Sequence, residues 1–204
     1  MLHAPEKLGP KAYNIRMQSG RYVDLASPSS KVIDAVDLAW ALSNIARFNG
    51  HARSPVTVLE HLLNAYDRAC ELDAPEAVRY AALMHDAQEA FVGDVSTPLK
   101  ALIGESYNHI EDGWQRAVFR WAGLDPTLAH HPTVKRIDRE MLLTEARDFH
   151  GASEEELKQY WPAGDPLPDF LDRRELSSAR GRFVGLTAIC RGLSFPPPIG
   201  ERLE

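Results

Sequence analysis

A His-Asp pair within an apolar run is the feature that most constrains this chain. His85 and Asp86 follow residues 81–84, an Ala-Ala-Leu-Met stretch whose side chains favour burial. A carboxylate in such surroundings must be paired, hydrogen-bonded or bound to a metal ion. Two further groups of the same chemistry, His61 and Asp138, lie in other segments with helical patterns. We therefore expect these four side chains to meet at one polar site, and we interpret it as a metal site that performs hydrolysis.

The composition is that of an ordinary globular protein with one domain. Of its 204 residues, 44% are hydrophobic and 25% charged, which excludes the disordered and fibrous classes. The amino terminus lacks a signal-peptide core and no apolar stretch approaches the roughly 20 residues of a membrane span, so we expect a cytoplasmic protein. The formal net charge of −6 argues against a broad nucleic-acid surface. Cys70 and Cys190 fit buried thiols better than a disulfide in that compartment.

The periodicity predicts an all-α domain with a small N-terminal β-hairpin. Residues 13–25 alternate apolar and polar around Ser19-Gly20, the pattern of a short hairpin whose turn uses the glycine. Beyond it, apolar residues recur at helical spacing. We expect one domain over residues 1–204 with its core in residues 30–150. Helices are predicted from a cap at Ser29 or Ser30 to about 46, from after Ser54-Pro55, from Pro75-Glu76 through His85-Asp86, and over about 105–122, 134–149 and 173–193, with a Pro-rich connection at 161–171.

Glu89 is the candidate catalytic carboxylate. On a helix that continues through His85 and Asp86, Glu89 lies one turn further along, beside both. Imidazole and carboxylate together suit a divalent Mn, Fe, Co, Ni or Zn ion, whose remaining positions can take water and substrate. Because coordination lowers the pKa of water towards neutrality, Glu89 could orient or deprotonate a nucleophile there. Asp94, which follows Gly93, is expected at a loop or helix edge nearby.

Each of these residues also has an ordinary explanation when it is taken alone. His61 is consistent with a hydrogen-bonded core histidine, the pair at 85–86 with a polar patch on a helix, and Asp138 with a charged helix surface. Their joint arrangement favours a site. Neighbours that we assign ordinary roles are Glu140 and Glu145 as helix-surface charges, His130 and His131 as solvent-facing loop residues, and Trp114, Phe119 and Trp121 as core residues.

Three sequence strings resemble the HD-domain superfamily of metal-dependent phosphohydrolases. They are residues 46–51 (Ala-Arg-Phe-Asn-Gly-His), residues 58–61 (Val-Leu-Glu-His) and residues 82–100, which contain His-Asp-Ala-x-Glu-(x)₄-Asp-x-x-x-Pro-x-Lys. The order of a histidine, a His-Asp pair and a distant aspartate is the signature of that superfamily. The resemblance runs from the hairpin to about residue 150. It is strongest to the branch of bacterial 5′-deoxynucleotidases and phage-type deoxynucleotide triphosphohydrolases.

The resemblance implies an all-α fold and one divalent ion bound by His61, His85, Asp86 and Asp138. It also implies that the carboxylates at 89 and 94 serve catalysis, through water activation, leaving-group protonation or contact with the sugar. In some relatives a second ion can bind near those carboxylates. Relatives commonly form dimers or larger rings, so we expect a homo-oligomer.

Four residues are candidates for substrate contacts by the same resemblance. Arg47 and Phe48 fall where nucleotidase relatives carry an Arg-Trp pair that contacts phosphate and sugar; the phenylalanine leaves discrimination between deoxyribose and ribose open. Lys100 could neutralise a phosphate as a point cation, and His51 could contact substrate. Plainer explanations stay open: a helix-end cation followed by a core aromatic for Arg47 and Phe48, and a solvated helix end for Lys100.

These residues favour a nucleotide phosphohydrolase, most simply a 5′-nucleotidase that acts on deoxynucleoside monophosphates. One alternative is a deoxynucleoside triphosphate triphosphohydrolase, for which Arg53 and Arg79 are candidate contacts beyond the first phosphate. Another is a non-catalytic module that senses a nucleotide, although such a module has no need of the two catalytic carboxylates. A third is an oxidative di-iron enzyme, which requires extra histidine ligands that only His130 or His131 could supply.

Overall fold

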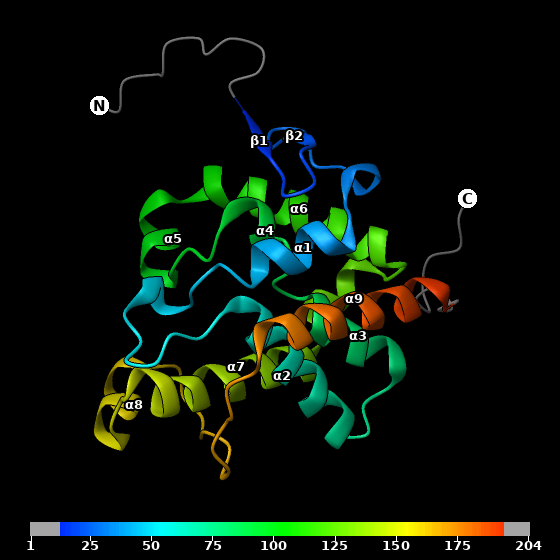
Figure 1. The fold of residues 1–204 in the computed structure, drawn as a ribbon. Helices are drawn as coiled ribbons and strands as arrows, with labels where there is room; N and C mark the ends of the chain where they lie inside the picture. The colour runs from blue at the N-terminus through cyan, green and yellow to red at the C-terminus, as the bar shows by residue number, and fades with distance from the viewer. Residues whose placement is uncertain (1–12, 194–204) are drawn as a thin grey trace, which may run out of the picture.

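The computed structural model describes residues 13–193, and this part is mostly helical with a small two-stranded hairpin, as predicted (Figure 1). The outer ends of the predicted domain, 1–12 and 194–204, lie outside the described residues. Within residues 13–193, no helix combines the length and apolar character needed to cross a bilayer. The elements are β1 Asn14–Arg16, β2 Tyr22–Asp24, η1 Ser30–Val32, α1 Ala35–Leu42, η2 Phe48–Gly50, α2 Val58–Glu71, α3 Glu76–Met84, α4 Glu89–Val92, α5 Thr97–Ile103, α6 Glu105–Ala122, η3 Pro126–His130, α7 Pro132–Glu145, η4 Ala146–His150, α8 Glu154–Tyr160 and α9 Leu176–Gly192.

The hairpin forms at the predicted place and docks on α1. Strands β1 and β2 pair antiparallel, and Gly20 at the turn has a φ of 88°, a value that glycine adopts without a Cβ clash. The buried carboxylate of Asp37 accepts hydrogen bonds from the backbone N–H and the hydroxyl of Ser19, at 2.8 and 2.7 Å, and from Arg21. One acid on α1 therefore fixes the tip of the hairpin.

The first helix is shorter than predicted, and its cap is a different residue. Ser29 caps only the 3₁₀ turn η1, because Ile33 then adopts an extended backbone that interrupts the helix. Helix α1 starts after Asp34, whose side chain accepts from the N–H groups of residues 36 and 37. Beyond the end of α1, Ala46 forms an antiparallel bridge with Thr57 instead of continuing the helix.

Two other helix ends also differ from the prediction. Helix α2 begins at Val58, not directly after Pro55, because Thr57 and Glu60 form a reciprocal capping box. Helix α3 ends at Met84, so His85 and Asp86 lie in a turn and not in a helix continuous with Glu89. The N–H of Glu89 donates to the carbonyl of Asp86 at 3.0 Å. Glu89 therefore still follows one tight turn after the pair.

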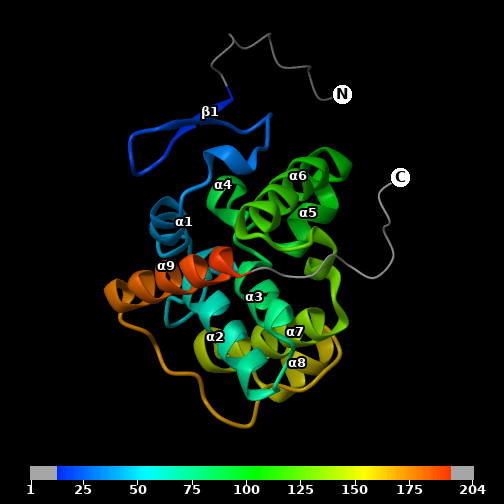
Figure 2. The same cartoon turned by 90° about the vertical axis from the view of Figure 1, so that its right-hand side faces the viewer.

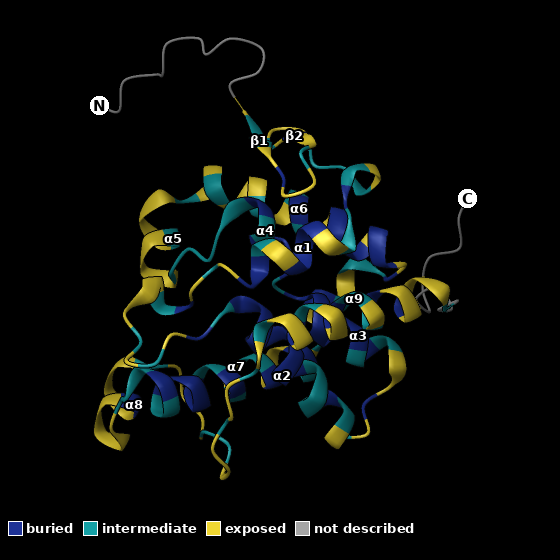
Figure 3. Ribbon diagram, viewed as in Figure 1, coloured by how far each residue is buried: buried dark blue, intermediate teal, exposed yellow. Residues whose placement is uncertain are grey.

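The core lies where α2 and α3 pack together, with α7 against both helices and α9 across α1 and α2 (Figures 1 and 2). Figure 3 shows the buried residues concentrated on the inner faces of α1, α2 and α3, while α5 and α8 at the periphery are largely exposed. The predicted core residues Trp114, Phe119 and Trp121 are buried. Both cysteines are free, as predicted, although Cys70 is only partly buried.

Helix α9 returns across the core and is tied to α2 by ion pairs. The Pro-rich stretch 161–171 is an irregular and mostly exposed connection, as predicted. Directly after it, Arg173 donates to Glu60 of α2 at 2.8 Å, and Arg174 donates to Asp67 at 2.7 Å. Arg182 pairs with the same Asp67. These carboxylates therefore hold the C-terminal helix on the bundle.

Replacement of Glu60 should weaken this attachment and change its dependence on pH. Burial raises the pKa of Glu60. Hydrogen bonds from the Arg173 side chain and from the backbone N–H groups of Thr57 and Arg174 have the larger effect and leave this pKa below its usual value. Ionised Glu60 therefore stabilises the fold above its unfolded pKa of about 4.3, and this stabilisation is lost as the pH falls through the lower folded value. We expect Glu60→Gln to reduce the free energy of unfolding at pH 7 by about 1.5–3 kcal/mol.

Urea unfolding between pH 7 and pH 3 measures the effect. The Glu60→Gln curve should fall less steeply with acidification than the wild-type curve. Glu71→Gln, which removes an exposed partner of Arg68 on the same helix, is the matched control and should change stability by less than about 1 kcal/mol. Equal acid sensitivity in Glu60→Gln and wild type would contradict the assignment.

Candidate metal centre and its cavity

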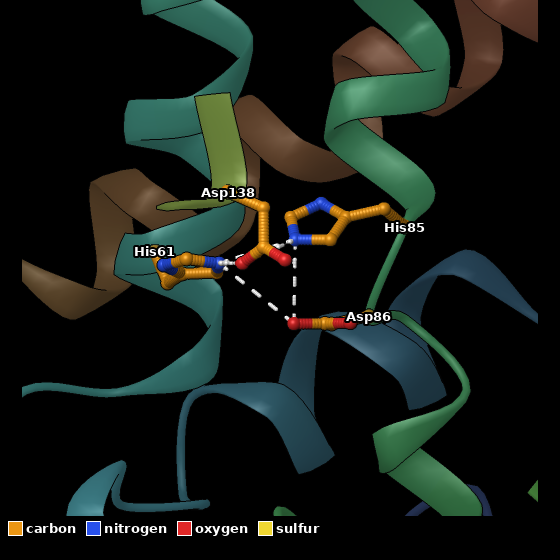
Figure 4. A group of neighbouring side chains, drawn as sticks. All are labelled: His61, His85, Asp86 and Asp138. Carbon is orange, nitrogen blue, oxygen red and sulfur yellow. Dashed lines mark hydrogen bonds and ion pairs between the residues drawn. The ribbon is translucent and has the colours of Figure 1, made fainter. Parts of the chain in front are cut away.

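Four side chains from three separate parts of the chain converge at one point (Figure 4). His61 comes from α2, His85 and Asp86 from the turn directly after α3, and Asp138 from α7. One nitrogen or oxygen of each lies within 4.8 Å of all the others. These are the four residues whose meeting the sequence predicted, and they form a group positioned to hold a metal ion.

The distances in this cluster fit coordination of one ion. The Nε2 atoms of His61 and His85 are 3.2 Å apart, and the Nε2 of His85 lies 3.3 Å from Asp86 Oδ2 and 3.5 Å from Asp138 Oδ1. Ligand atoms about 2.1 Å from a common ion are roughly 3.0–3.4 Å apart in octahedral or tetrahedral geometry. The Nε2 of His61 lies further from Asp86 Oδ2 and Asp138 Oδ1, at 3.8 and 3.6 Å. Helices α2 and α7 and the turn after α3 thus bring their donor atoms close to the separations expected around one divalent ion.

Hydrogen bonds on the far side of each ring turn both histidines towards the cluster. The Nδ1 of His85 lies 2.8 Å from the carbonyl of Ala82, and the Nδ1 of His61 lies 2.9 Å from Oε1 of Glu145. Since each Nδ1 donates there, each Nε2 keeps its lone pair for a ligand. Two lone pairs at 3.2 Å repel unless a cation or a proton lies between them, so this donor set fits a metal ion.

Glu145 was predicted to be an ordinary surface charge, and this prediction was wrong. Its side chain is completely buried. Oε1 faces His61, while Oε2 accepts a hydrogen bond from Nε of Arg47 at 2.7 Å. Glu145 follows Asp138 by seven residues, two helical turns, so both project from the same face of α7. Glu140 lies elsewhere on the helix and pairs with Arg68, as an ordinary helix charge does.

The charges within the cluster compensate one another. Burial lowers the pKa of His85, but the carboxylates of Asp86 and Asp138 outweigh it and raise the pKa well above its usual value. Burial raises the pKa of Asp138, but hydrogen bonds from His61 and His85 lower it well below the usual range. The carboxylates therefore stay ionised and attract positive charge to the point where the four groups meet.

Glu89 and Asp94 lie on the wall of a cavity that opens from the cluster, together with Asp86 and Asp138. Burial, then the charges of Asp86 and Asp94, raise the pKa of Glu89 well above its usual value. Its Oε2 atom is buried and accepts no hydrogen bond within the described residues. Gly93 has φ 78° and ψ 162°, a conformation confined almost entirely to glycine. That glycine ends α4 and lets Asp94 line the cavity.

The cavity has a volume of about 720 Å³ and combines charged and apolar walls. Arg47, Phe48 and Lys100, the candidates for substrate contacts, are among the residues that line it. Arg47 is buried, and Lys100 donates to Glu111 at 2.6 Å. The neighbouring lining residues are Asn49, Val95, Ser96, Thr97, Pro98, Lys135, Leu142, Tyr160, Trp161 and Pro162.

Several other candidates lie outside this wall. His51 and Arg53 are exposed and are not among the residues that line the cavity. Arg79 donates to the carbonyl of Ala74 at the start of α3. His130 is exposed and His131 caps α7 through the N–H of residue 133; in the described part of the chain, neither belongs to the metal-compatible group.

Glu145 was not recognised from the sequence, and neither were several cavity-lining residues, among them Lys135, Tyr160 and Trp161. Lys135 precedes Asp138 by three residues on α7, so helical spacing from Asp138 could have indicated it. Tyr160 ends α8 and Trp161 follows it, beyond the segment that carries the motifs. No local pattern connects them to the cavity, because the connection depends on how α8 packs against α7.

Comparison with known proteins identifies relatives but no matching family model. An uncharacterized protein of Rhodobacter capsulatus is 35% identical over 159 residues, which cover 74% of this chain and 81% of that protein. The uncharacterized protein YfdR of Escherichia coli K12 is 33% identical over 156 residues, or 76% of this chain and 80% of YfdR. The chain belongs to the family of these two proteins.

Removal of the Glu145 carboxylate should weaken metal binding. Glu145→Gln leaves the four ligand atoms in the chain but disturbs the groups that orient His61 and hold Arg47. Replacement of such a supporting group typically costs 10–100-fold in metal affinity, and we expect a loss in that range for Mn²⁺ or Zn²⁺. Isothermal titration into chelator-treated protein measures it, and the rise in melting temperature with added metal gives a second readout.

Glu140→Gln is the matched control, since Glu140 lies on the same helix and faces Arg68 instead of the cluster. Its metal affinity should stay within about twofold of wild type. Wild-type affinity in folded Glu145→Gln would show that Glu145 does not support the metal centre.

Proposed function

We propose that this protein is an HD-type, metal-dependent phosphohydrolase that acts on nucleotides, and that deoxynucleoside monophosphates are its preferred substrates. The observation that carries the proposal is the joint position of two sets of groups. The metal-compatible cluster of four residues opens into a cavity that also contains Glu89, Asp94 and Arg47. A plain structural ion site has no need of a cavity with extra acids and cations around it.

The charge balance of the cavity suits an anionic substrate. Four carboxylic side chains line it, at 86, 89, 94 and 138, with three cationic ones, Arg47, Lys100 and Lys135. A bound divalent cation turns this excess of negative charge into an excess of positive charge. The overall net charge of −6 therefore does not oppose phosphate binding at this place.

Each group has a role that follows from its position. His61, His85, Asp86 and Asp138 would hold the ion, which supplies Lewis-acid polarisation of a phosphoryl oxygen and a lowered pKa for water. Arg47, fixed by Glu145, directs its remaining N–H donors to phosphate oxygens. Oε2 of Glu89, buried and free of hydrogen bonds from the described residues, accepts the proton of the attacking water. Asp94, which lines the same cavity, is the second proton-transfer group.

A monophosphate fits the cationic residues better than a triphosphate does. Arg53 and Arg79, the candidates for contacts beyond the first phosphate, are not among the residues that line the cavity. Arg79 is held at the start of α3 by the carbonyl of Ala74. The cations on the wall are Arg47, Lys100 and Lys135, and the first two already pair with carboxylates. This favours hydrolysis that releases inorganic phosphate. A single domain over residues 1–204, a homo-oligomer and a cytoplasmic location stay predictions.

Replacement of a proposed ligand and of the proposed base should have different effects. Asp86→Ala should lose both bound metal and turnover, because it removes one of four ligands. Glu89→Gln should retain metal but lose about 10²–10⁴-fold in kcat, the usual contribution of general acid–base catalysis. Metal content by mass spectrometry and phosphate release measure the two effects. Asp112→Asn, which alters an exposed acid on α6, is the control; full activity in Asp86→Ala would refute the assignment.

A nucleotide screen tests the reaction itself. Protein loaded with Mn²⁺, Co²⁺, Fe²⁺, Ni²⁺ or Zn²⁺ is offered mono-, di- and triphosphates, and phosphate and triphosphate release are followed separately. We expect phosphate release from deoxynucleoside monophosphates to dominate. Triphosphate release would favour a triphosphohydrolase. Nucleotide binding without turnover under every metal would contradict an enzyme and support a sensing module.

A further inference from the structure

One wall of the cavity is aromatic and is built largely by a segment beyond the metal-site motifs. Phe48, from the loop before α2, makes an edge-to-face contact with Trp161, which directly follows α8. The ring centroids are 5.7 Å apart and the planes are inclined by 73°. His150 stands edge-on to both rings, at 5.4 Å from Phe48 and 6.0 Å from Trp161. Phe48 and Trp161 line the cavity, with Tyr160 and Pro162 beside them. His150 contacts both rings and is not among the residues that line the cavity.

The structure holds both rings in place. Trp161 packs on a small separate core of Leu143, Ala146 and Leu157, between α7 and α8. Phe48 has a φ of 56°, a left-handed conformation that is rare for a bulky residue and costs of order 1–3 kcal/mol. Such backbone strain is typical of functional sites, where a side chain must hold one orientation. Here the strained residue directly follows Arg47 and puts its ring into the cavity.

We infer that the nucleobase of the substrate stacks on the face of the Trp161 ring, with Phe48 as the adjoining part of the same wall. The inference rests on the proposed function and names the part of the substrate that this wall recognises. Aromatic side chains bind bases through their faces, and all bases have such faces, so stacking tolerates differences in base identity. The wall therefore fits a nucleoside phosphate better than a phosphate on an open-chain or purely aliphatic group.

The order of groups along α7 supports this orientation. Lys135, Asp138 and Leu142 all line the cavity and follow one another at helical spacing on one face. Leu142 lies about 6 Å further along the axis than Asp138, and the small core under Trp161 begins at the next residue, Leu143. A cation, a metal-site acid and an apolar contact thus succeed one another towards the aromatic wall. A nucleotide whose phosphate lies at Lys135 and the metal-site acid would extend its sugar and base in that same direction.

Arg47 connects the phosphate region with the aromatic wall. Its Nε is fixed by Glu145 beside the metal cluster, and its guanidinium carbon lies 5.6 Å from the centroid of the Phe48 ring. A cation over a ring face gains about 0.5–1 kcal/mol or more. A ligand whose phosphate meets Arg47 therefore has an aromatic surface within the reach of one sugar.

The test compares a nucleotide with the same sugar phosphate lacking a base. For wild type and Trp161→Ala, kcat/KM is measured on 2′-deoxyadenosine 5′-monophosphate and on 2-deoxyribose 5-phosphate. We expect the preference for the nucleotide to fall by about fivefold or more, the lower end of what stacking on one aromatic side chain contributes. Trp161→Phe should retain most of the preference. Trp40→Ala on α1, whose partly exposed ring stacks with Arg180, is the matched control and should retain all of it.

Two results would overturn the inference, and they differ from failure of the proposed function. Equal losses on both substrates in Trp161→Ala, with an unchanged melting temperature, would show that the ring does not recognise the base. No turnover of any nucleotide by wild type would reject the proposed function instead. Equilibrium dialysis with 2′-deoxyadenosine then tests whether the aromatic wall binds the base. Binding that weakens in Trp161→Ala supports the inference, and binding that is absent or unchanged overturns it.

Discussion

The carboxylate of Glu145 accepts hydrogen bonds from His61 on one oxygen and from Arg47 on the other. It connects a proposed metal ligand on α2 with a cation from the loop that precedes that helix. Both partners are buried, so each would be costly to leave unpaired. Helix α7, which also carries Asp138, can deliver this bridge only if it packs against α2 and α3. The geometry of the cluster and the position of the cavity cation therefore depend on the same helix packing.

That packing explains why the site has two unlike sides. The acids at 86, 89, 94 and 138 and the rings of Phe48 and Trp161 line one cavity of about 720 Å³. The acidic side is buried by the core helices, whereas the aromatic side is held by the small core between α7 and α8. The strained backbone of Phe48 directs its ring into the cavity, and the conformation of Gly93 lets the next residue, Asp94, line the same cavity. The site is therefore a junction of rigid helices with two specialised turns.

Much of this could be predicted from local pattern. The hairpin, α6 with its end at Gly123, and the Pro-rich connection follow from turn residues and from apolar periodicity. Helix ends were less predictable: Asp34 caps α1 in place of Ser29, and the turn at 85–88 separates the His-Asp pair from Glu89. A serine and an aspartate are both good caps. Which one is used depends on where the backbone must bend to pack, and periodicity alone does not specify that.

The sequence by itself determined the chemistry of the site: two imidazoles and two carboxylates in segments that favour burial, with further acids at positions 89 and 94. Only the tertiary structure decided which of the other charges join them. Glu140 and Glu145 look alike in the sequence, yet one faces Arg68 near the surface and the other is buried against His61, 84 residues away along the chain. Helical spacing gives the face of a residue on its own helix. Contacts between distant segments determine which partner covers that face. They therefore determine which charged side chains are buried away from water.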